Sequence, residues 1–231
     1  MGSAGLSTAG VVWAGTNPYT NATEKFDGSA WATSGNYPVS GSYGNGCGTQ
    51  GAALGVSLYQ GSPFGICNEF NGSSWSGGGT IPNNNYSVGA CGTLSAGVAV
   101  GAEGAPNPGA GSQHQFYNGS SWTSNTSIPF NRAFYGNGVM GKQDDTLVMG
   151  GQSGPPTAPT TTEYWNGSAW AAQGTLPVGS ASTSCGNNGP SGATSITMGN
   201  GTSSPVDVRD TVMEGIAAAG TPSARAISSA S

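Results

Sequence analysis

Aromatic residues gather in short runs along the chain, and each run is interrupted by an Asp-Gly or Asn-Gly dipeptide. Four runs share one order of apolar and polar positions: TEKFDGSAW (23–31), CNEFNGSSW (67–75), HQFYNGSSW (114–122) and TEYWNGSAW (162–170). Such a dipeptide between strand-like runs predicts a two-residue hairpin loop, because both turn residues need positive φ. In that register Phe26 pairs with Ser29 and Glu24 with Trp31, so that Phe26 and Trp31 lie diagonally on one face. Each run therefore supplies one aromatic face for burial.

These runs belong to a repeat that extends over the whole chain. The closing tryptophans are 44, 47 and 48 residues apart, and a proline follows each by seven residues: Trp31, Trp75, Trp122 and Trp170. A fifth copy, DTVMEGIAA (210–218), places Gly215 at the turn and Ala218 where the Trp stands, with Pro222 after it. From Pro222 across the chain ends to Pro38 the interval is 47 residues, which matches the others. Residues 1–231 therefore form a single predicted domain of five units of about 46 residues.

Two strands rich in small residues precede each hairpin. The nearer strands are GVVWAG (10–15), ALGVSLYQG (53–61), SAGVAVGAEG (95–104), TLVMGG (146–151) and TSITMGNG (194–201). The farther strands are YGNGCG (43–48), SVGACG (87–92), FYGNGV (134–139) and STSCGN (182–187). Four short strands in about 46 residues is the size of one propeller blade.

We therefore predict an all-β, five-bladed β-propeller with four short antiparallel strands in each blade. The chain enters at the second strand of the first blade, and ARAISSAS (224–231) supplies the missing first strand. The N- and C-terminal strands then share a blade and close the ring, which leaves no strand edge unpaired. An open stack of hairpins or an elongated fibre is the alternative.

Composition narrows the classes of protein that fit this pattern. Charged residues make up 6% of the chain, and 42 of its 231 residues are glycine, which disfavours helix. A net charge of −5 without a basic cluster argues against nucleic acid, and no apolar run is long enough to cross a bilayer. The first residues lack the positive region of a signal peptide.

The repeat resembles the kelch repeat, whose family folds as β-propellers with four-stranded blades. The resemblance rests on the Gly150-Gly151 doublet, the aromatic residue before each turn and the Trp after it. The finer pattern is similar to the low-charge kelch-like repeats of structural proteins of marine bacteriophages, and this similarity implies a virion protein.

Residue types that carry catalysis are scarce in the sequence. His114 is the only histidine and stands where other units have Thr23, Cys67 and Thr162, so we interpret it as an ordinary strand residue. One histidine does not supply the copper site of galactose-oxidase-like enzymes. Three arginines (Arg132, Arg209 and Arg225), two of them in the last unit, and a turn one residue too short do not supply a sialidase site.

Cysteines and one adjacent pair of carboxylates are the remaining candidates for a metal-binding site. Cys47, Cys91 and Cys185 occupy matching positions on three inner strands, with Val139 in a fourth unit, whereas Cys67 has no counterpart. A ring of thiols at the axis would bind a soft metal, but small apolar packing is the interpretation that we favour. Asp144 and Asp145 form an adjacent pair that we expect to be solvated. The sequence thus predicts no catalytic, cofactor-binding or metal-binding residue, and it assigns no ligand-binding residue.

These observations predict a non-enzymatic virion structural or attachment protein of a bacteriophage: a tail, fibre or capsid-decoration component. Its expected partners are other virion proteins, a host-surface glycan or further copies of itself, without nucleic acid or membrane insertion. It would be made in the host cytoplasm and become extracellular after lysis. The alternative is a carbohydrate-binding propeller module for host glycans, whose exposed Tyr and Trp would stack on sugar rings. An enzyme is the third hypothesis.

Overall fold

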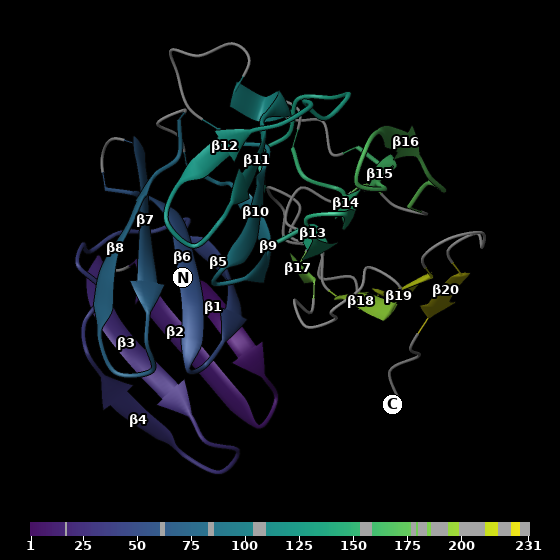
Figure 1. Ribbon diagram of the computed structural model, residues 1–231. Helices are drawn as coiled ribbons and strands as arrows, with labels where there is room; N and C mark the ends of the chain where they lie inside the picture. Colours follow the sequence, from purple (N-terminus) through teal and green to yellow (C-terminus); the bar gives the residue numbers. More distant parts are fainter. Residues whose placement is uncertain are drawn as a thin grey trace.

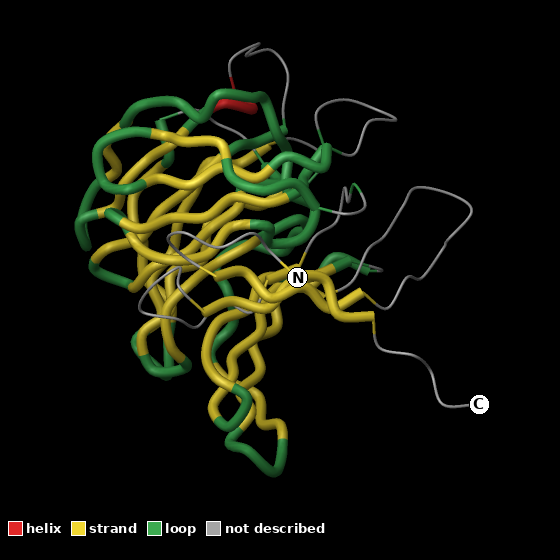
Figure 2. The backbone as a smooth tube through the Cα atoms, turned by 90° about the vertical axis from the view of Figure 1, so that its right-hand side faces the viewer, coloured by secondary structure: helices red, strands yellow, loops and turns green. Residues whose placement is uncertain are grey.

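The fold is all-β, as predicted, with almost no helix (Figures 1 and 2). The computed structural model describes residues 1–16, 18–60, 63–82, 86–103, 110–152, 159–176 and 179, together with the strand segments 184–185, 194–198, 211–216 and 223–226. Within these residues the only helical segment is a 3₁₀ turn, η1 (Ala110–Ser112). The low share of helix-forming residues accounts for this.

Four consecutive stretches of chain each fold into a sheet of four antiparallel strands. The first sheet contains β1 (Gly2–Leu6), β2 (Ala9–Gly15), β3 (Thr20–Phe26) and β4 (Trp31–Ser34). The second contains β5 (Asn45–Thr49), β6 (Ala52–Tyr59), β7 (Pro63–Phe70) and β8 (Trp75–Thr80). The third contains β9 (Gly89–Thr93), β10 (Ala96–Val100), β11 (His114–Tyr117) and β12 (Trp122–Ser124). The fourth contains β13 (Val139–Lys142), β14 (Asp145–Met149), β15 (Thr162–Trp165) and β16 (Trp170–Ala172).

A further set of strands follows in the same order, and we call it the C-terminal sheet. It contains β17 (Ser184–Cys185), β18 (Thr194–Met198), β19 (Thr211–Ile216) and β20 (Ser223–Ala226). Gly215 lies within β19 opposite Ser195, so the prediction that Gly215 forms the turn of a fifth hairpin is wrong. Ala218 and Pro222 lie outside the described residues.

The strand that comes first in each sheet lies innermost. β1 lies against β5, β5 against β9, and β9 against β13, so the sheets are arranged side by side around their first strands (Figure 1). Small residues occupy these strands because space is tight there. A Cβ atom on Gly46 of β5, for example, would lie 2.4 Å from the ring of Trp13.

The predicted closure through a shared blade is wrong. All four strands of the first sheet come from residues 2–34, and its first strand is β1, which the sequence analysis did not recognise as a strand. The innermost strand β1 pairs with β2, and β20 pairs with β19. Each sheet is open. Of residues 224–231, which were predicted to close the ring, the structure describes residues 224–226, and these belong to β20.

The aromatic hairpins form, but with longer loops than predicted. Phe26 lies directly opposite Trp31, and the loop between them is 27–30. The Asp27 Oδ1 atom accepts hydrogen bonds of 2.9 Å from the backbone N–H groups of Ser29 and Ala30. This side-chain bond favours a four-residue loop, with Gly28 at φ +98°. The three other hairpins repeat the loop with Asn71, Asn118 and Asn166 in the acceptor role.

The hydrophobic core consists of layers between neighbouring sheets. Trp13 of β2 packs with Leu58 and Phe70 of the second sheet. The next two layers join the second sheet to the third and the third to the fourth. The hairpin tryptophan of one sheet reaches the sheet before it, since Trp75 Nε1 donates to Thr23 Oγ1 at 2.9 Å and Trp170 Nε1 donates to Thr126 O at 3.0 Å.

Candidate functional site

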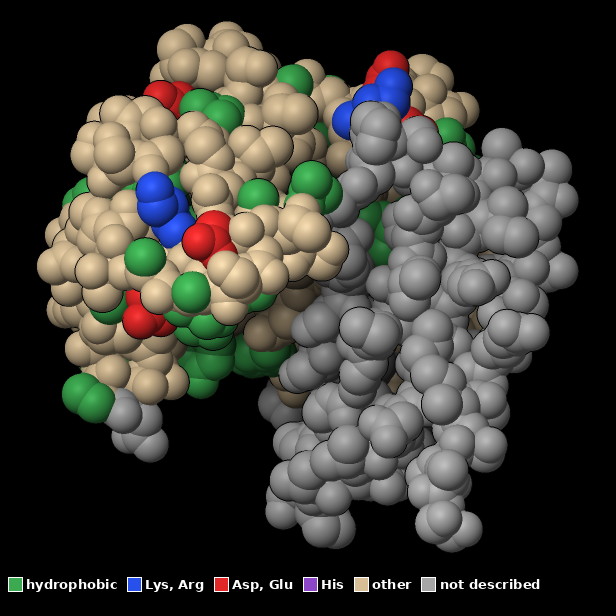
Figure 3. Space-filling view, turned by 90° about the horizontal axis from the view of Figure 1, so that it is seen from below, with side chains coloured by type: hydrophobic (Ala, Val, Ile, Leu, Met, Phe, Trp, Pro, Cys, Tyr) green, Lys and Arg blue, Asp and Glu red, His purple; other side chains and the backbone are tan. Residues whose placement is uncertain are grey.

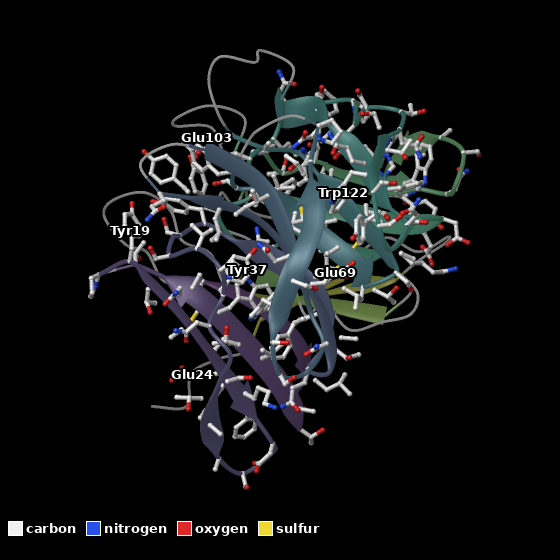
Figure 4. All side chains as sticks on the ribbon, turned by 60° about the vertical axis from the view of Figure 1, so that its left-hand side comes forward. Tyr19, Glu24, Tyr37, Glu69, Glu103 and Trp122 are labelled. Carbon is white, nitrogen blue, oxygen red and sulfur yellow. The ribbon has the colours of Figure 1, made fainter. Side chains whose placement is uncertain are left out.

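Four tyrosines from three sheets gather at one end of the strands. We define the tyrosine cluster as Tyr43, Tyr59, Tyr86 and Tyr135 together with Glu103. Tyr43, Tyr86 and Tyr135 precede the innermost strands β5, β9 and β13, whereas Tyr59 ends β6 and Glu103 follows β10. The antiparallel topology brings all five positions to the same end of their sheets. Figure 4 shows Glu103 at this end, and Tyr19 lies at the same side of the view.

The rings of the cluster contact one another rather than pack into the core. Tyr43 lies at its centre, with ring centroids 6.1, 5.9 and 5.8 Å from those of Tyr59, Tyr86 and Tyr135. The ring centroids of Tyr59 and Tyr86 lie 4.7 Å apart. The Tyr43 side chain is 42% exposed, and the other three tyrosines are half-buried. The cluster therefore presents aromatic surface to solvent from several sheets at once.

Local backbone geometry places these side chains beyond the regular strands. Ser42 and Tyr59 exchange backbone hydrogen bonds of 2.9 and 2.8 Å, and Tyr86 and Glu103 exchange bonds of 3.0 and 2.8 Å. Tyr43 lies between the first of these hydrogen-bonded pairs and β5, and Ser87 lies between the second pair and β9. Both residues have φ +54°, in the left-handed region. Non-glycine residues rarely adopt this conformation, and it is concentrated at functional sites.

A buried amide fixes the base of the cluster. The Asn45 side chain on β5 donates through Nδ2 to Val88 O at 2.7 Å and to Phe134 O at 3.3 Å. These carbonyls belong to the segments that lead into β9 and β13. Asn45 therefore ties three innermost strands together directly below the tyrosines.

One carboxylate supplies the charge of the cluster. The Tyr135 hydroxyl donates to Glu103 Oε2. Burial and the nearby Glu103 carboxylate raise the pKa of Tyr86, and burial together with the hydrogen bond to Glu103 raises the pKa of Tyr135. Both phenols therefore stay protonated at neutral pH, and each uses its O–H in a hydrogen bond with Glu103. Glu103 is half-buried and carries an acceptor that a ligand hydroxyl can use.

The sequence analysis missed this site because the tyrosines lie outside the repeated hairpin. The available signal was a tyrosine before three of the inner strands, at positions 43, 86 and 135. The different residue spacing in the three units conceals that these tyrosines converge.

His114 lies on β11, as predicted for an ordinary strand residue, and it belongs to an aromatic layer between the third and fourth sheets. Its ring lies 4.9 Å from those of Trp165 and Trp170, and its Nδ1 atom donates to Thr126 O at 3.1 Å. Burial lowers its pKa to about 4. The geometry is that of a neutral imidazole used in packing.

Cys47 and Cys91, the described members of the predicted thiol ring, lie in two different layers of the core. Cys47 lies in the layer between the second and third sheets, and Cys91 lies in the layer between the third and fourth. The residue that matches them in the fourth sheet is Met140, because Met140 precedes Gly141 as the cysteines precede Gly48 and Gly92; the predicted match with Val139 is wrong. The preferred interpretation as apolar packing is thus confirmed for both thiols, and burial raises the pKa of Cys47.

The other two cysteines are placed on different strands. Cys67 lies on β7, where burial raises its pKa to about 12. Cys185 lies on β17, and its side chain is outside the described part of the chain. No group of three or more His, Cys, Asp or Glu side chains that would hold a metal ion occurs among the described residues.

The remaining charged candidates have structural contacts. Asp144 forms an exposed ion pair of 2.8 Å with Lys142, as expected for a solvated carboxylate. Asp145 begins β14 and is half-buried, so the expectation that both carboxylates are solvated is wrong for Asp145. Arg132, by contrast, is buried and pairs with Glu163 at 2.6 Å. Arg209 lies outside the described residues, and Arg225 lies on β20.

Comparisons with known proteins give no family. No protein-family model matches the chain, and no curated protein matches it. Among the described residues, no helix has the length and apolar character to span a bilayer.

Proposed function

We propose that this chain is a non-enzymatic binding protein that recognises carbohydrate through the tyrosine cluster. The observation that carries the proposal is the convergence of four tyrosine rings from three sheets around one carboxylate, with Tyr43 exposed at the centre. Tyrosine offers a rigid, amphipathic contact surface at low cost in side-chain entropy. Its ring face packs against apolar C–H groups, and its hydroxyl hydrogen-bonds.

Sugar rings match this combination of groups. A pyranose has one face of C–H groups that packs on an aromatic ring and an edge of hydroxyls that needs donors and acceptors. Glu103 and the phenol oxygens of Tyr86 and Tyr135 offer acceptors beside the exposed Tyr43 ring, whose own hydroxyl can donate. The low charge of the chain disfavours strongly anionic or cationic ligands. Figure 3 shows one face on which the few charged side chains lie scattered among uncharged ones.

We further propose that the sheets form a five-bladed kelch-like propeller and that the binding end serves attachment of a phage particle to its host. Support for the architecture comes from the four-stranded sheets arranged side by side and from the repeat of about 46 residues. Support for the virion setting comes from the resemblance of the repeat to phage structural proteins. A rigid set of sheets with a binding end formed by loops suits attachment.

A glycan array with single variants tests the binding proposal. The wild-type chain should bind a defined set of glycans saturably, and Tyr43→Ala and Glu103→Gln should each weaken that binding at least tenfold, about 1.4 kcal/mol. Tyr19→Ala is the matched control, since Tyr19 is 46% exposed and lies outside the cluster. Equal losses in Tyr43→Ala and Tyr19→Ala would contradict the assignment. Absence of glycan binding by a chain that still incorporates tightly into particles would favour a purely structural virion role.

A further inference from the structure

The carboxylate of the tyrosine cluster has no cationic partner among the described side chains. Three of the chain's five Lys and Arg residues have described side chains, and all three are engaged elsewhere. Lys25 donates to Gly72 O at 2.8 Å, Arg132 pairs with Glu163, and Lys142 pairs with Asp144. Glu103 is half-buried, and none of these cations lies within ion-pair distance of it.

The hydrogen bonds that Glu103 accepts orient its charge without neutralising it. Its donors are the hydroxyls of Tyr135 and Tyr86, which carry no charge. A carboxylate has about four lone-pair sites, so it retains acceptor positions for a ligand. Burial and the Glu103 carboxylate raise the pKa of Tyr86, because a phenolate there would be a second negative charge. The same negative potential favours a positive charge beside the cluster.

The tyrosine rings attract cations for a second reason. The face of an aromatic ring is electron-rich, and an ammonium group within about 6 Å of the ring centroid is attracted to it. The Tyr43 side chain is 42% exposed, and its ring centroid lies 5.8 Å from that of Tyr135, which donates to Glu103. A ligand that packs on Tyr43 is therefore one tyrosine ring away from the carboxylate.

We propose that the tyrosine cluster prefers an amino sugar, a sugar with one free ammonium group, over uncharged sugars of the same shape. The inference rests on the proposed carbohydrate binding and names the class of sugar. The pyranose packs on Tyr43, and its ammonium group pairs with Glu103 beside the tyrosine faces. Glu103 is the only carboxylate of the cluster, so it matches one ammonium group, whereas a polycation would leave further charges without partners.

Three ligands that differ only at C2 of one sugar test the preference. Methyl β-glucosaminide carries an ammonium group there, its N-acetyl derivative an amide, and methyl β-glucoside a hydroxyl. In NMR titrations, the full chain should bind the glucosaminide about tenfold more tightly than the other two. The preference should shrink as salt is added, because salt screens the charge of Glu103.

Two results of these titrations would overturn the preference. Equal affinities that still depend on Tyr43 would overturn it and leave carbohydrate binding in place. Binding of none of the three ligands would also overturn it, and the glycan array then decides separately whether another sugar is bound.

A charge-neutral variant locates the preference at the cluster. In Glu103→Gln the ratio of glucosaminide to N-acetyl affinity should fall from about ten to about one. Glu24→Gln is the matched control, since Glu24 is exposed on the first sheet and its loss changes the net charge equally (Figure 4). The control should keep the ratio, and equal losses in both variants would overturn the assignment to Glu103. An unchanged thermal midpoint checks folding, because the bonds between Tyr86 and Glu103 across this end are backbone bonds.

An ammonium compound without a sugar ring separates this inference from the proposal on which it rests. Ethanolamine has the same ammonium group and a hydroxyl but no pyranose to pack on Tyr43. It should bind at least tenfold more weakly than the glucosaminide. Ethanolamine affinity equal to that of the glucosaminide, and lost in Glu103→Gln, would overturn amino-sugar recognition and contradict the carbohydrate proposal as well.

Discussion

At the scale of single residues, close packing decides where glycine is required. Gly46 lies on β5 beneath the indole of Trp13, and a Cβ atom there would lie 2.4 Å from that ring. We expect Gly46→Ala to lower the free energy of unfolding by about 1–3 kcal/mol, because Trp13 has to shift within a filled layer. Urea unfolding measured by tryptophan fluorescence checks the value.

A second glycine provides the control for this prediction. Gly77 lies on β8 with no atom within 4 Å of its would-be Cβ atom, and its φ is not in the left-handed region. Gly77→Ala should therefore leave stability unchanged or raise it slightly. Similar losses in both variants would mean that backbone freedom rather than the contact with Trp13 selects glycine at position 46.

Residue-level rules explain which parts of the hairpin could be predicted. The Asn-Gly and Asp-Gly dipeptides correctly indicated four hairpins, each with its aromatic pair on one face. They did not give the register, because the side-chain oxygen of Asp27 or its Asn equivalents binds two backbone N–H groups and stabilises a longer loop. Phe26 and Trp31 are consequently opposite rather than diagonal, with ring centroids 5.2 Å apart.

At the scale of elements, the hairpin tryptophan holds one sheet to the next. The Trp75 ring lies 5.0 Å from Trp13 and 4.7 Å from Tyr37, and its Nε1 atom donates to Thr23 Oγ1. Trp75→Ala should cost about 3–5 kcal/mol, because it removes an aromatic side chain shared by two sheets. Phe130→Ala is the control, since Phe130 is 54% exposed, and it should change stability by less than about 0.5 kcal/mol. A loss below 1 kcal/mol for Trp75→Ala in denaturant unfolding would show that the tryptophan does not join the sheets.

The sequence did not predict which residues from different elements contact one another in the site. The tyrosine cluster combines residues from three units, and the unequal spacing of Tyr43, Tyr86 and Tyr135 within their units hides their common location. The pairing of Arg132 with Glu163 likewise joins two units. A repeat predicts which residues are equivalent, but it does not predict which equivalent positions face each other across an interface.

At the scale of the whole molecule, composition predicted the fold class well because glycine, low charge and short strand-like runs leave few alternatives. The closure was predicted wrongly because β1 (Gly2–Leu6) has only one large apolar residue besides its small ones and lacks an aromatic residue, so the first unit seemed to lack a strand. In the structure β1 pairs with β2, and Gly2 lies opposite Trp13, where a larger residue would clash with the indole. The small residues that hid this strand in the sequence are thus the ones that fit beside Trp13.

The whole chain contains a single histidine, so the contribution of histidine to the pH dependence of its stability can be isolated. Burial lowers the pKa of His114 to about 4, whereas an unfolded histidine titrates near pH 6.5. Between these values the unfolded state binds more protons than the folded state, so stability falls as the pH falls. We expect a loss of about 2 kcal/mol between pH 7 and pH 5 in urea unfolding.

His114→Thr is the control for this pH profile, because Thr23 and Thr162 occupy the equivalent positions. Burial raises the pKa of Glu163, which acts with the opposite sign: its contribution to stability is greatest at low pH and is lost as the pH rises. Glu163 is present in both chains, so the difference between their pH profiles isolates the imidazole. The wild-type profile should slope more steeply than that of His114→Thr over this range. Parallel profiles would mean that His114 is protonated as readily in the folded chain as in the unfolded one, which is incompatible with its place between Trp165 and Trp170.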